Sequence, residues 1–211
     1  MTREELLKEI AQKGYNISYS ANINFATYDL YTRITKSISF ISLIGGVLPF
    51  AYPEHFGTKF VAICLFTIGV IGVYIEQFTD TIESYAQRGV EDTERLNALK
   101  AMYYKCKDDA RDENRDFPDG YNEILESFYA QSEHRQLIFS GWFAHFKMFS
   151  QKRYEVLWFE RELGLTFLKD KLPRSFWPIL VAIVVCLFIY CFLNCPNWQM
   201  IGNTILNCGC G

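Results

Sequence analysis

The chain has 211 residues, of which 50% are hydrophobic, 17% aromatic and 21% charged, and its formal net charge is −3. This charge argues against a nucleic-acid binder that acts through bulk electrostatics, because such proteins carry a clear positive excess. The first twenty residues include Glu4, Glu5 and Glu9 and contain no apolar core. We therefore expect no cleavable signal peptide.

Residues 1–33 are predicted to form a polar, tyrosine-rich helical region. Glycine disfavours a helix interior, so we expect a break near Gly14. Residues 32–36 contain no helix breaker, so this helix is expected to continue into the apolar stretch that follows.

Two uncharged stretches, residues 38–52 and 60–75, flank seven residues that include proline and glycine. A helix needs about 20 apolar residues to cross a bilayer, and each stretch approaches this length if Lys36 and Lys59 extend toward the lipid headgroups. We predict a transmembrane hairpin over residues 34–75. A third uncharged stretch predicts a transmembrane helix over residues 176–193. The alternative, three buried core helices, requires a larger soluble shell than the charged residues supply.

Residues 76–175 are charge-rich and show helical spacing of apolar residues from Phe78 to Tyr103. No proline separates them from the second span, so we expect that span to continue into a long helix, kinked or ended at Gly89. Residues 121–171 are again predicted to be helical. They carry an aromatic stripe, which is either the core of a helical bundle or the membrane-facing side of an interfacial helix. The stripe consists of Phe139, Trp142, Phe143, Phe146 and Phe149, and the flanking cations are Lys147, Lys152 and Arg153.

Lysine and arginine are distributed unevenly around the predicted spans. They precede the first span and are frequent in residues 76–175, and none follows Arg174. The positive-inside rule therefore predicts that the N-terminus and residues 76–175 are cytoplasmic and that the tail, residues 194–211, is outside. An oxidising exterior would permit disulfides in this region, although free thiols are the alternative. The candidate cysteines are Cys191, Cys195, Cys208 and Cys210.

Familiar catalytic motifs are absent from the sequence. There is no phosphate-binding loop, dinucleotide-binding glycine motif or nucleophile elbow, and the three histidines match no metal-ligand spacing. We therefore expect no enzyme, no cofactor and no metal site.

The first predicted span carries a stripe of small and hydroxyl-bearing residues: Thr35, Ser39, Ser42 and Gly46. Their spacing of four, three and four residues places them on one helix face. Such a stripe either allows close helix packing, with the hydroxyls bonded back to their own helix, or lines a pore. A single chain offers too few polar faces to enclose a channel, so a pore would require a homo-oligomer, which we expect to be a tetramer or larger.

The order of these elements resembles a known family. The polar helix "YNISYSANINFATYDLYTRITKSISFISLIGG", the two-span hairpin and the segment "YIEQFTDTIESYAQRGVEDTERLNALKAMYYKCKDD" resemble SLATT domains over residues 5–170. These are SMODS- and SLOG-associating two-transmembrane effectors of bacterial conflict systems. The third span and the cysteine-containing tail depart from that pattern.

The resemblance implies a pore-forming effector of anti-phage defence, controlled by a nucleotide or oligonucleotide signal or by a partner nucleotidyltransferase. We accordingly predict an all-α membrane protein that conducts ions as a homo-oligomer in the lipid bilayer. The alternative is a non-conducting anchor or scaffold for a cytoplasmic partner. The candidate contacts for an anionic ligand are Arg88, Arg95, Lys100, Lys105 and Lys107.

Overall fold

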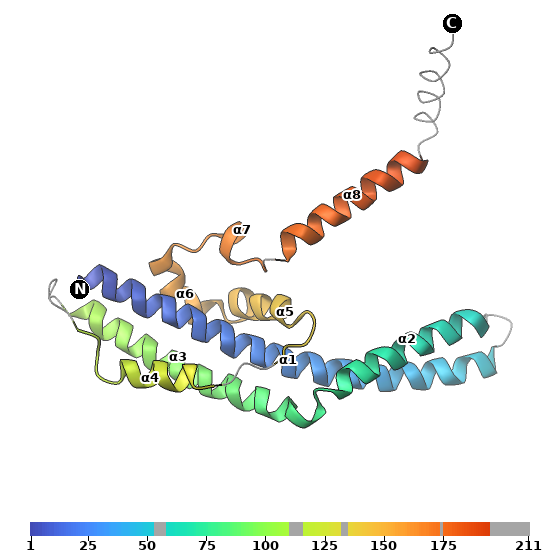
Figure 1. The fold of residues 1–211 in the computed structure, drawn as a ribbon, viewed down its shortest axis with the longest axis horizontal. Helices are drawn as coiled ribbons and strands as arrows, with labels where there is room; N and C mark the ends of the chain where they lie inside the picture. The colour runs from blue at the N-terminus through green and yellow to red at the C-terminus, as the bar shows by residue number, and fades with distance from the viewer. Residues whose placement is uncertain (53–57, 110–115, 132–134, 174, 195–211) are drawn as a thin grey trace, which may run out of the picture. The chain divides into compact units, whose positions relative to one another are not determined.

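The computed structural model describes residues 1–52, 58–109, 116–131, 135–173 and 175–194 (Figure 1). It is 85% helical, and its described residues contain no strand, which confirms the predicted all-α class. The chain divides into two compact units, residues 1–171 and residues 172–211.

Helix α1, Arg3–Ala51, is one continuous helix of 49 residues. Thr2 begins it with a capping box, in which its hydroxyl accepts a hydrogen bond from the Glu5 amide at 3.2 Å and the Glu5 carboxylate accepts one from the Thr2 amide at 2.8 Å. Figure 1 shows α1 running from the helical bundle into the hairpin that it forms with α2. The predicted continuity into the first span is confirmed, and the predicted break near Gly14 is wrong.

Two glycines inside helices are sites where an aromatic ring lies against the backbone. A Cβ atom on Gly14 would lie 2.4 Å from the Trp158 ring, and one on Gly89 would lie 2.7 Å from the Phe25 ring. The missing side chains let α6 approach α1 closely and let a ring from α1 rest on α3. Gly89 lies inside α3, so the predicted end of a helix at this glycine is also wrong.

The second helix of the hairpin does not continue into the bundle as predicted. Helix α2, Thr58–Glu76, is followed by a turn and a 3₁₀ turn, η1, Thr79–Thr81, before α3, Ile82–Asp108, begins. The amide and the hydroxyl of Thr81 both donate to the Phe78 carbonyl, at 3.1 and 3.3 Å. The break allows Phe78 to enter a buried cluster. Helical periodicity in the sequence alone does not reveal this break. The cluster consists of Ile75, Phe78, Ile82, Tyr85 and Leu137.

The region predicted as helical over residues 121–171 consists of short pieces. They are α4, Tyr121–Tyr129; α5, Ser140–Phe146; the π-helical segment η2, Lys147–Gln151; α6, Arg153–Leu163; and α7, Phe167–Asp170. Gly164, at φ 60°, ends α6 in the left-handed conformation that glycine adopts readily. Together with α3 and the first part of α1, these pieces form the bundle, which packs around a main core. Its largest fully buried side chains include Leu6, Ile10, Ile17, Leu99, Tyr103 and Phe159.

The predicted aromatic stripe is divided between the edge of the core and the surface of the bundle, and Phe149 packs against the main core. The residues of α5 and η2 that are buried are Ser140, Ala144 and Met148, which recur every four residues, whereas Phe139 and Phe146 are exposed. Small residues on the inner face let α5 pack closely on α1. Trp142 and Phe143 are half-buried, and only Phe139 and Phe146 of the stripe are exposed.

The hairpin of α1 and α2 is apolar on its outside. Lys59–Glu76 of α2 is long and apolar enough to cross a membrane, and only 6% of this window is buried. It is the one such helix in the part of the chain that the structure describes. In the second unit, α8, Phe176–Asn194, is helical as predicted, but its apolar part, Phe176–Cys191, is shorter than 18 residues. The predicted third span is therefore not confirmed.

The two glycine contacts predict that added methyl groups will destabilise the bundle. Alanine is normally preferred over glycine in a helix by about 1 kcal/mol. Here Trp158 is almost fully buried and cannot swing away, so we expect overpacking to outweigh this preference and Gly14→Ala to cost about 1–3 kcal/mol, with a similar result for Gly89→Ala. Thermal unfolding in detergent measures the effect. Gly141→Ala, in α5 of the same bundle, is the matched control, because a Cβ there meets only the Tyr19 hydroxyl at 3.5 Å, an ordinary contact, and an equal loss in all three variants would contradict the explanation.

Candidate functional site

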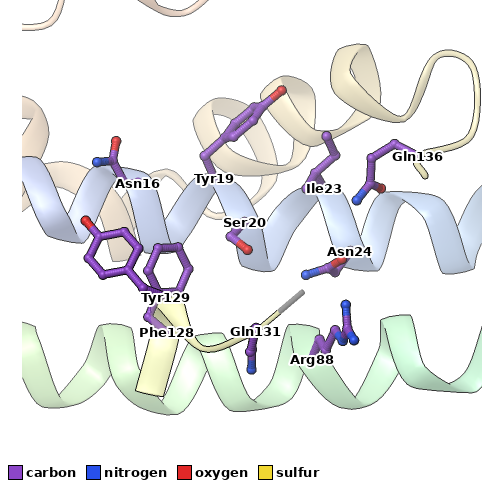
Figure 2. Close-up of a pocket in the computed structure, with 10 residues that line it drawn as sticks. All are labelled: Asn16, Tyr19, Ser20, Ile23, Asn24, Arg88, Phe128, Tyr129, Gln131 and Gln136. Atoms are coloured by element: carbon purple, nitrogen blue, oxygen red, sulfur yellow. The ribbon is translucent and has the colours of Figure 1, made fainter. Parts of the chain in front are cut away.

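The bundle contains a polar pocket of about 480 Å³ between α1, α3 and α4 (Figure 2). This volume lies within the range of small-molecule sites. Helix α1 provides half of the lining residues, α3 provides Arg88, and α4 provides two aromatic rings. The lining residues are Asn16, Tyr19, Ser20, Ile23, Asn24, Arg88, Phe128, Tyr129, Gln131 and Gln136.

The pocket combines one positive charge with uncharged hydrogen-bonding groups and aromatic rings. Arg88 is its one charged lining residue, and four carboxamides from asparagine and glutamine offer both donors and acceptors. Carboxamides recognise the edges of planar heterocycles, aromatic rings stack on their faces, and arginine binds phosphate or carboxylate. This set of groups suits a small anionic ligand that carries a planar ring.

A buried hydrogen-bond network holds α1 to α3 beside the pocket. The Ser20 hydroxyl donates to the Asp92 carboxylate at 2.6 Å, and Arg95 forms an ion pair with the same carboxylate at 2.8 Å. Asp92 is fully buried, and burial raises the pKa of its carboxyl, although the hydrogen bonds from Ser20 and Arg95 oppose the rise. A buried, hydrogen-bonded ion pair fixes local geometry, so this network positions Ser20 in the pocket wall.

Two lining glutamines of the pocket are held by side-chain hydrogen bonds to distant segments. Gln131 donates to the Glu91 carboxylate at 2.8 Å, and the Thr27 hydroxyl lies 2.5 Å from the Gln136 side-chain oxygen. These bonds attach the chain on both sides of residues 132–134 to α3 and α1.

The structure separates the five basic residues that the sequence suggested as ligand contacts. Arg88 lines the pocket, whereas Arg95 is engaged by Asp92 and by the Ser127 hydroxyl at 3.0 Å. Lys100 and Lys105 do not line it. Lys107 lies at a second cleft, of about 250 Å³, where its ammonium donates to the Tyr103 hydroxyl at 3.2 Å.

Sequence reasoning missed the uncharged side of the pocket. Asn16, Ser20, Asn24 and Thr27 are spaced by four, four and three residues on α1, which places them on one helix face. This polar stripe is readable in the sequence. A polar face on a helix is usually solvent-exposed, however, and only the positions of α3 and α4 show that this one is enclosed.

The stripe in the hairpin does not form the seam between α1 and α2. A Cβ on Gly45 would meet Leu65 of α2 at 3.4 Å, whereas one on Gly46 would meet nothing within 4 Å. Successive helix residues point about 100° apart, so the stripe lies beside the closest contact. Thr35 and Ser39 are exposed, and Ser42 and Gly46 are half-buried. The Ser39 hydroxyl donates to the Thr35 carbonyl at 3.1 Å, as expected for a hydroxyl within an apolar segment.

Of the four candidate disulfide cysteines, only Cys191 is among the described residues, where it is a free thiol. Cys195, Cys208 and Cys210 lie outside the described residues, so disulfide pairing in the tail stays a prediction.

His145 is half-buried beside the pocket wall. Its ring centroid lies 5.3 Å from that of Tyr19, which lines the pocket, and 5.9 Å from that of Phe149. Burial lowers the pKa of His145 below 6.5, although a hydrogen bond with the Lys171 backbone opposes the shift. The folded protein therefore favours the neutral imidazole.

The fold and the hairpin define an all-helical protein in which a bundle is joined to a paired apolar helix hairpin. The family model for the SMODS and SLOG-associating 2TM effector domain 6 matches residues 1–180, which cover the bundle, the hairpin and only the start of α8. The chain belongs to this family, whose description names two transmembrane helices, and α2 is the described helix that is long and apolar enough to be one of them. Searches of curated proteins and of solved structures returned no match.

The buried histidine predicts a specific loss of stability in acid. The pKa of His145 is lower in the folded chain than in the unfolded chain, so the unfolded state binds the proton first. Stability is thus lost as the pH falls below 6.5 toward the folded-state pKa. Unfolding temperatures at pH 7.5 and 5.5 should differ less in His145→Gln than in the unchanged protein. An identical fall in unfolding temperature in both proteins would show that His145 is not the origin of the acid sensitivity.

Proposed function

We propose that this chain is a pore-forming membrane effector that assembles as a homo-oligomer and is controlled by a small anionic ligand, of the nucleotide class, bound in the polar pocket. The observation that carries the proposal is the continuity of α1. This one helix lines the pocket through Asn16 to Asn24 and carries the stripe from Thr35 to Gly46.

The continuous helix provides a direct mechanical connection between the two sites. Asn24 and Thr35 are eleven residues apart, which corresponds to about 16 Å along a helix. A ligand that draws α1, α3 and α4 together would rotate or tilt α1, and its membrane part would move with it. The ligand has to bind one position of α1 more tightly than the other, since only differential affinity shifts such an equilibrium.

The proposed pore wall is the stripe on α1. Its hydroxyls are wettable, and it lies beside the closest α1–α2 contact with Thr35 and Ser39 exposed, so copies of the chain can present it to a shared lumen. Glycines on α2, Gly69 and Gly72, also have no neighbour within 4 Å and leave room for close packing between copies. Both features support assembly of several chains around the stripe, and the oligomer that we propose is a tetramer or larger.

The setting that best fits the family is anti-phage defence at a bacterial inner membrane. In the proposed orientation the bundle is cytoplasmic, where a nucleotide signal or a partner nucleotidyltransferase would act. A non-conducting scaffold is the competing function, and it predicts ligand or partner binding without ion flux.

The pocket predicts nucleotide binding that depends on Arg88. Removing a charged hydrogen-bond donor typically costs about 1.5–3 kcal/mol, so Arg88→Ala should weaken binding by about tenfold or more. Isothermal titration with nucleoside phosphates and cyclic dinucleotides on the detergent-solubilised chain measures this. Arg153→Ala is the control, because Arg153 is an exposed arginine of α6 that does not line the pocket. Equal affinities in the two variants would show that the ligand binds elsewhere.

The stripe predicts that added apolar bulk will block ion flux. In a lumen, Ser39→Leu or Ser42→Leu raises the dewetting barrier, so liposomes should lose flux while the oligomer stays intact. Val47→Leu, at an exposed position of α1 outside the stripe, is the matched control and should conduct normally. Dissociation of the serine variants on size-exclusion chromatography would identify the stripe as a packing seam between copies. Unchanged flux in the serine variants would show that the stripe does not line the pore.

A further inference from the structure

The short loop before α5 exposes two large apolar side chains next to each other. Leu137 is 3% exposed and belongs to the buried cluster around Phe78, but Ile138 is 60% exposed and Phe139 is 68% exposed. Figure 1 shows this loop at the end of the bundle from which the hairpin extends.

The loop is fixed to the base of the hairpin. The Ile138 amide donates to the hydroxyl of Tyr74, in the last turns of α2, at 3.2 Å. The Leu137 carbonyl accepts a hydrogen bond from the Ser140 amide at 3.0 Å and closes a tight turn around the two exposed residues. Ile138 and Phe139 are therefore held at the level where α2 leaves its apolar segment.

The backbone of Phe139 is adapted to present its ring. Its φ of 71° lies in the left-handed region, which large side chains rarely adopt, and it is the one non-glycine residue with positive φ among the described residues. This conformation turns the chain from the buried Leu137 into α5 and leaves the ring outside the bundle.

Charged side chains near this level are those expected at a headgroup layer. Arg33 and Lys36 are exposed on α1, just before its uncharged stretch, and Arg33 lies 5.7 Å from the Phe143 ring centroid. Glu76 and Asp80 lie near the α2–α3 turn. The protein thus carries both positive and negative charges at this level. Insertion of apolar side chains, rather than net charge, would therefore provide the contact with the membrane.

We propose that the side chains of Ile138 and Phe139, which we call the tip, insert into the headgroup layer of the bilayer that holds α1 and α2. This contact would attach the bundle to the membrane surface. The occupant is lipid because the tip is continuous with the lipid-facing end of α2 through Tyr74. Exposed aromatic and aliphatic side chains are favoured at this depth. The tip would oppose tilting of the bundle away from the bilayer. The inference rests on insertion of the hairpin, but not on pore formation or on the ligand.

Photocrosslinking of the full-length chain in liposomes tests the contact. Replacing Phe139 with p-benzoylphenylalanine should give lipid adducts detectable by mass spectrometry. The same replacement of Tyr154, an 87% exposed aromatic on α6, should give none. Tyr154 is close in sequence to Trp158, which packs on Gly14, more than twenty residues before the uncharged stretch of α1. The replacement of Phe66, 74% exposed on α2, is the positive control for insertion.

The outcomes separate this proposal from the proposed function. Lipid adducts at positions 66 and 139 but not 154 support the tip contact. Adducts at 66 with none at 139, or adducts at 139 that join only protein, would overturn it while leaving insertion intact. Adducts at neither position would show that the hairpin is not inserted, and both proposals would then fail.

A second variant distinguishes membrane contact from a structural role. Glycine adopts positive φ freely, so Phe139→Gly should not lower the unfolding temperature. With p-benzoylphenylalanine at position 138, the same change should reduce the lipid adduct yield at least twofold, because the neighbouring anchor is lost. An unchanged yield would refute the anchor, and a large fall in unfolding temperature would show that the ring is a packing element.

Discussion

The close contacts between aromatic rings and helix backbones determine how the bundle is built. Trp158 lies over Gly14 and Phe25 lies over Gly89, so α6 rests on α1 and α1 rests on α3 at distances that any side chain would prevent. The contact between Phe25 and Gly89 allows α1 and α3 to lie close together beside the pocket. Ser20, Asp92 and Arg95 can then bond across the interface, and Arg88 can face the carboxamides of α1.

The same helix serves two environments, and its sequence changes accordingly. In the bundle, α1 presents a polar stripe to the pocket and apolar residues such as Ile10 and Ile17 to the core. In the hairpin its side chains are largely apolar and exposed, with small residues concentrated on one face. A helix that is continuous across this change makes the pocket and the membrane segment parts of one rigid element, which is the physical basis of the proposed control.

The helical class, the hairpin and the family followed from composition, hydropathy and the order of elements. The positions at which helices end or continue did not follow from these features. Intrinsic propensity disfavours glycine in helices and so predicts a break near Gly14 and a kink or an end at Gly89, but tertiary packing overrides that preference where a ring occupies the space. The interruption after Glu76 has no proline or glycine to mark it and depends on burial of Phe78. Arg88 was among the predicted contacts because charge is visible in a sequence, whereas the enclosing carboxamides depend on long-range packing.

The two connections between bundle and hairpin have different torsional stiffness. Helix α1 passes through without interruption, while η1 separates α2 from α3. A rotation of α1 in the bundle would therefore pass to the hairpin more directly through α1 than through α2, which is separated from α3 by η1. A side-chain atom about 5 Å from the helix axis moves roughly 3 Å when the helix turns by about 30°. A displacement of this size, repeated in each copy around a shared axis, equals the diameter of a water molecule and would be enough to wet or dry a narrow passage.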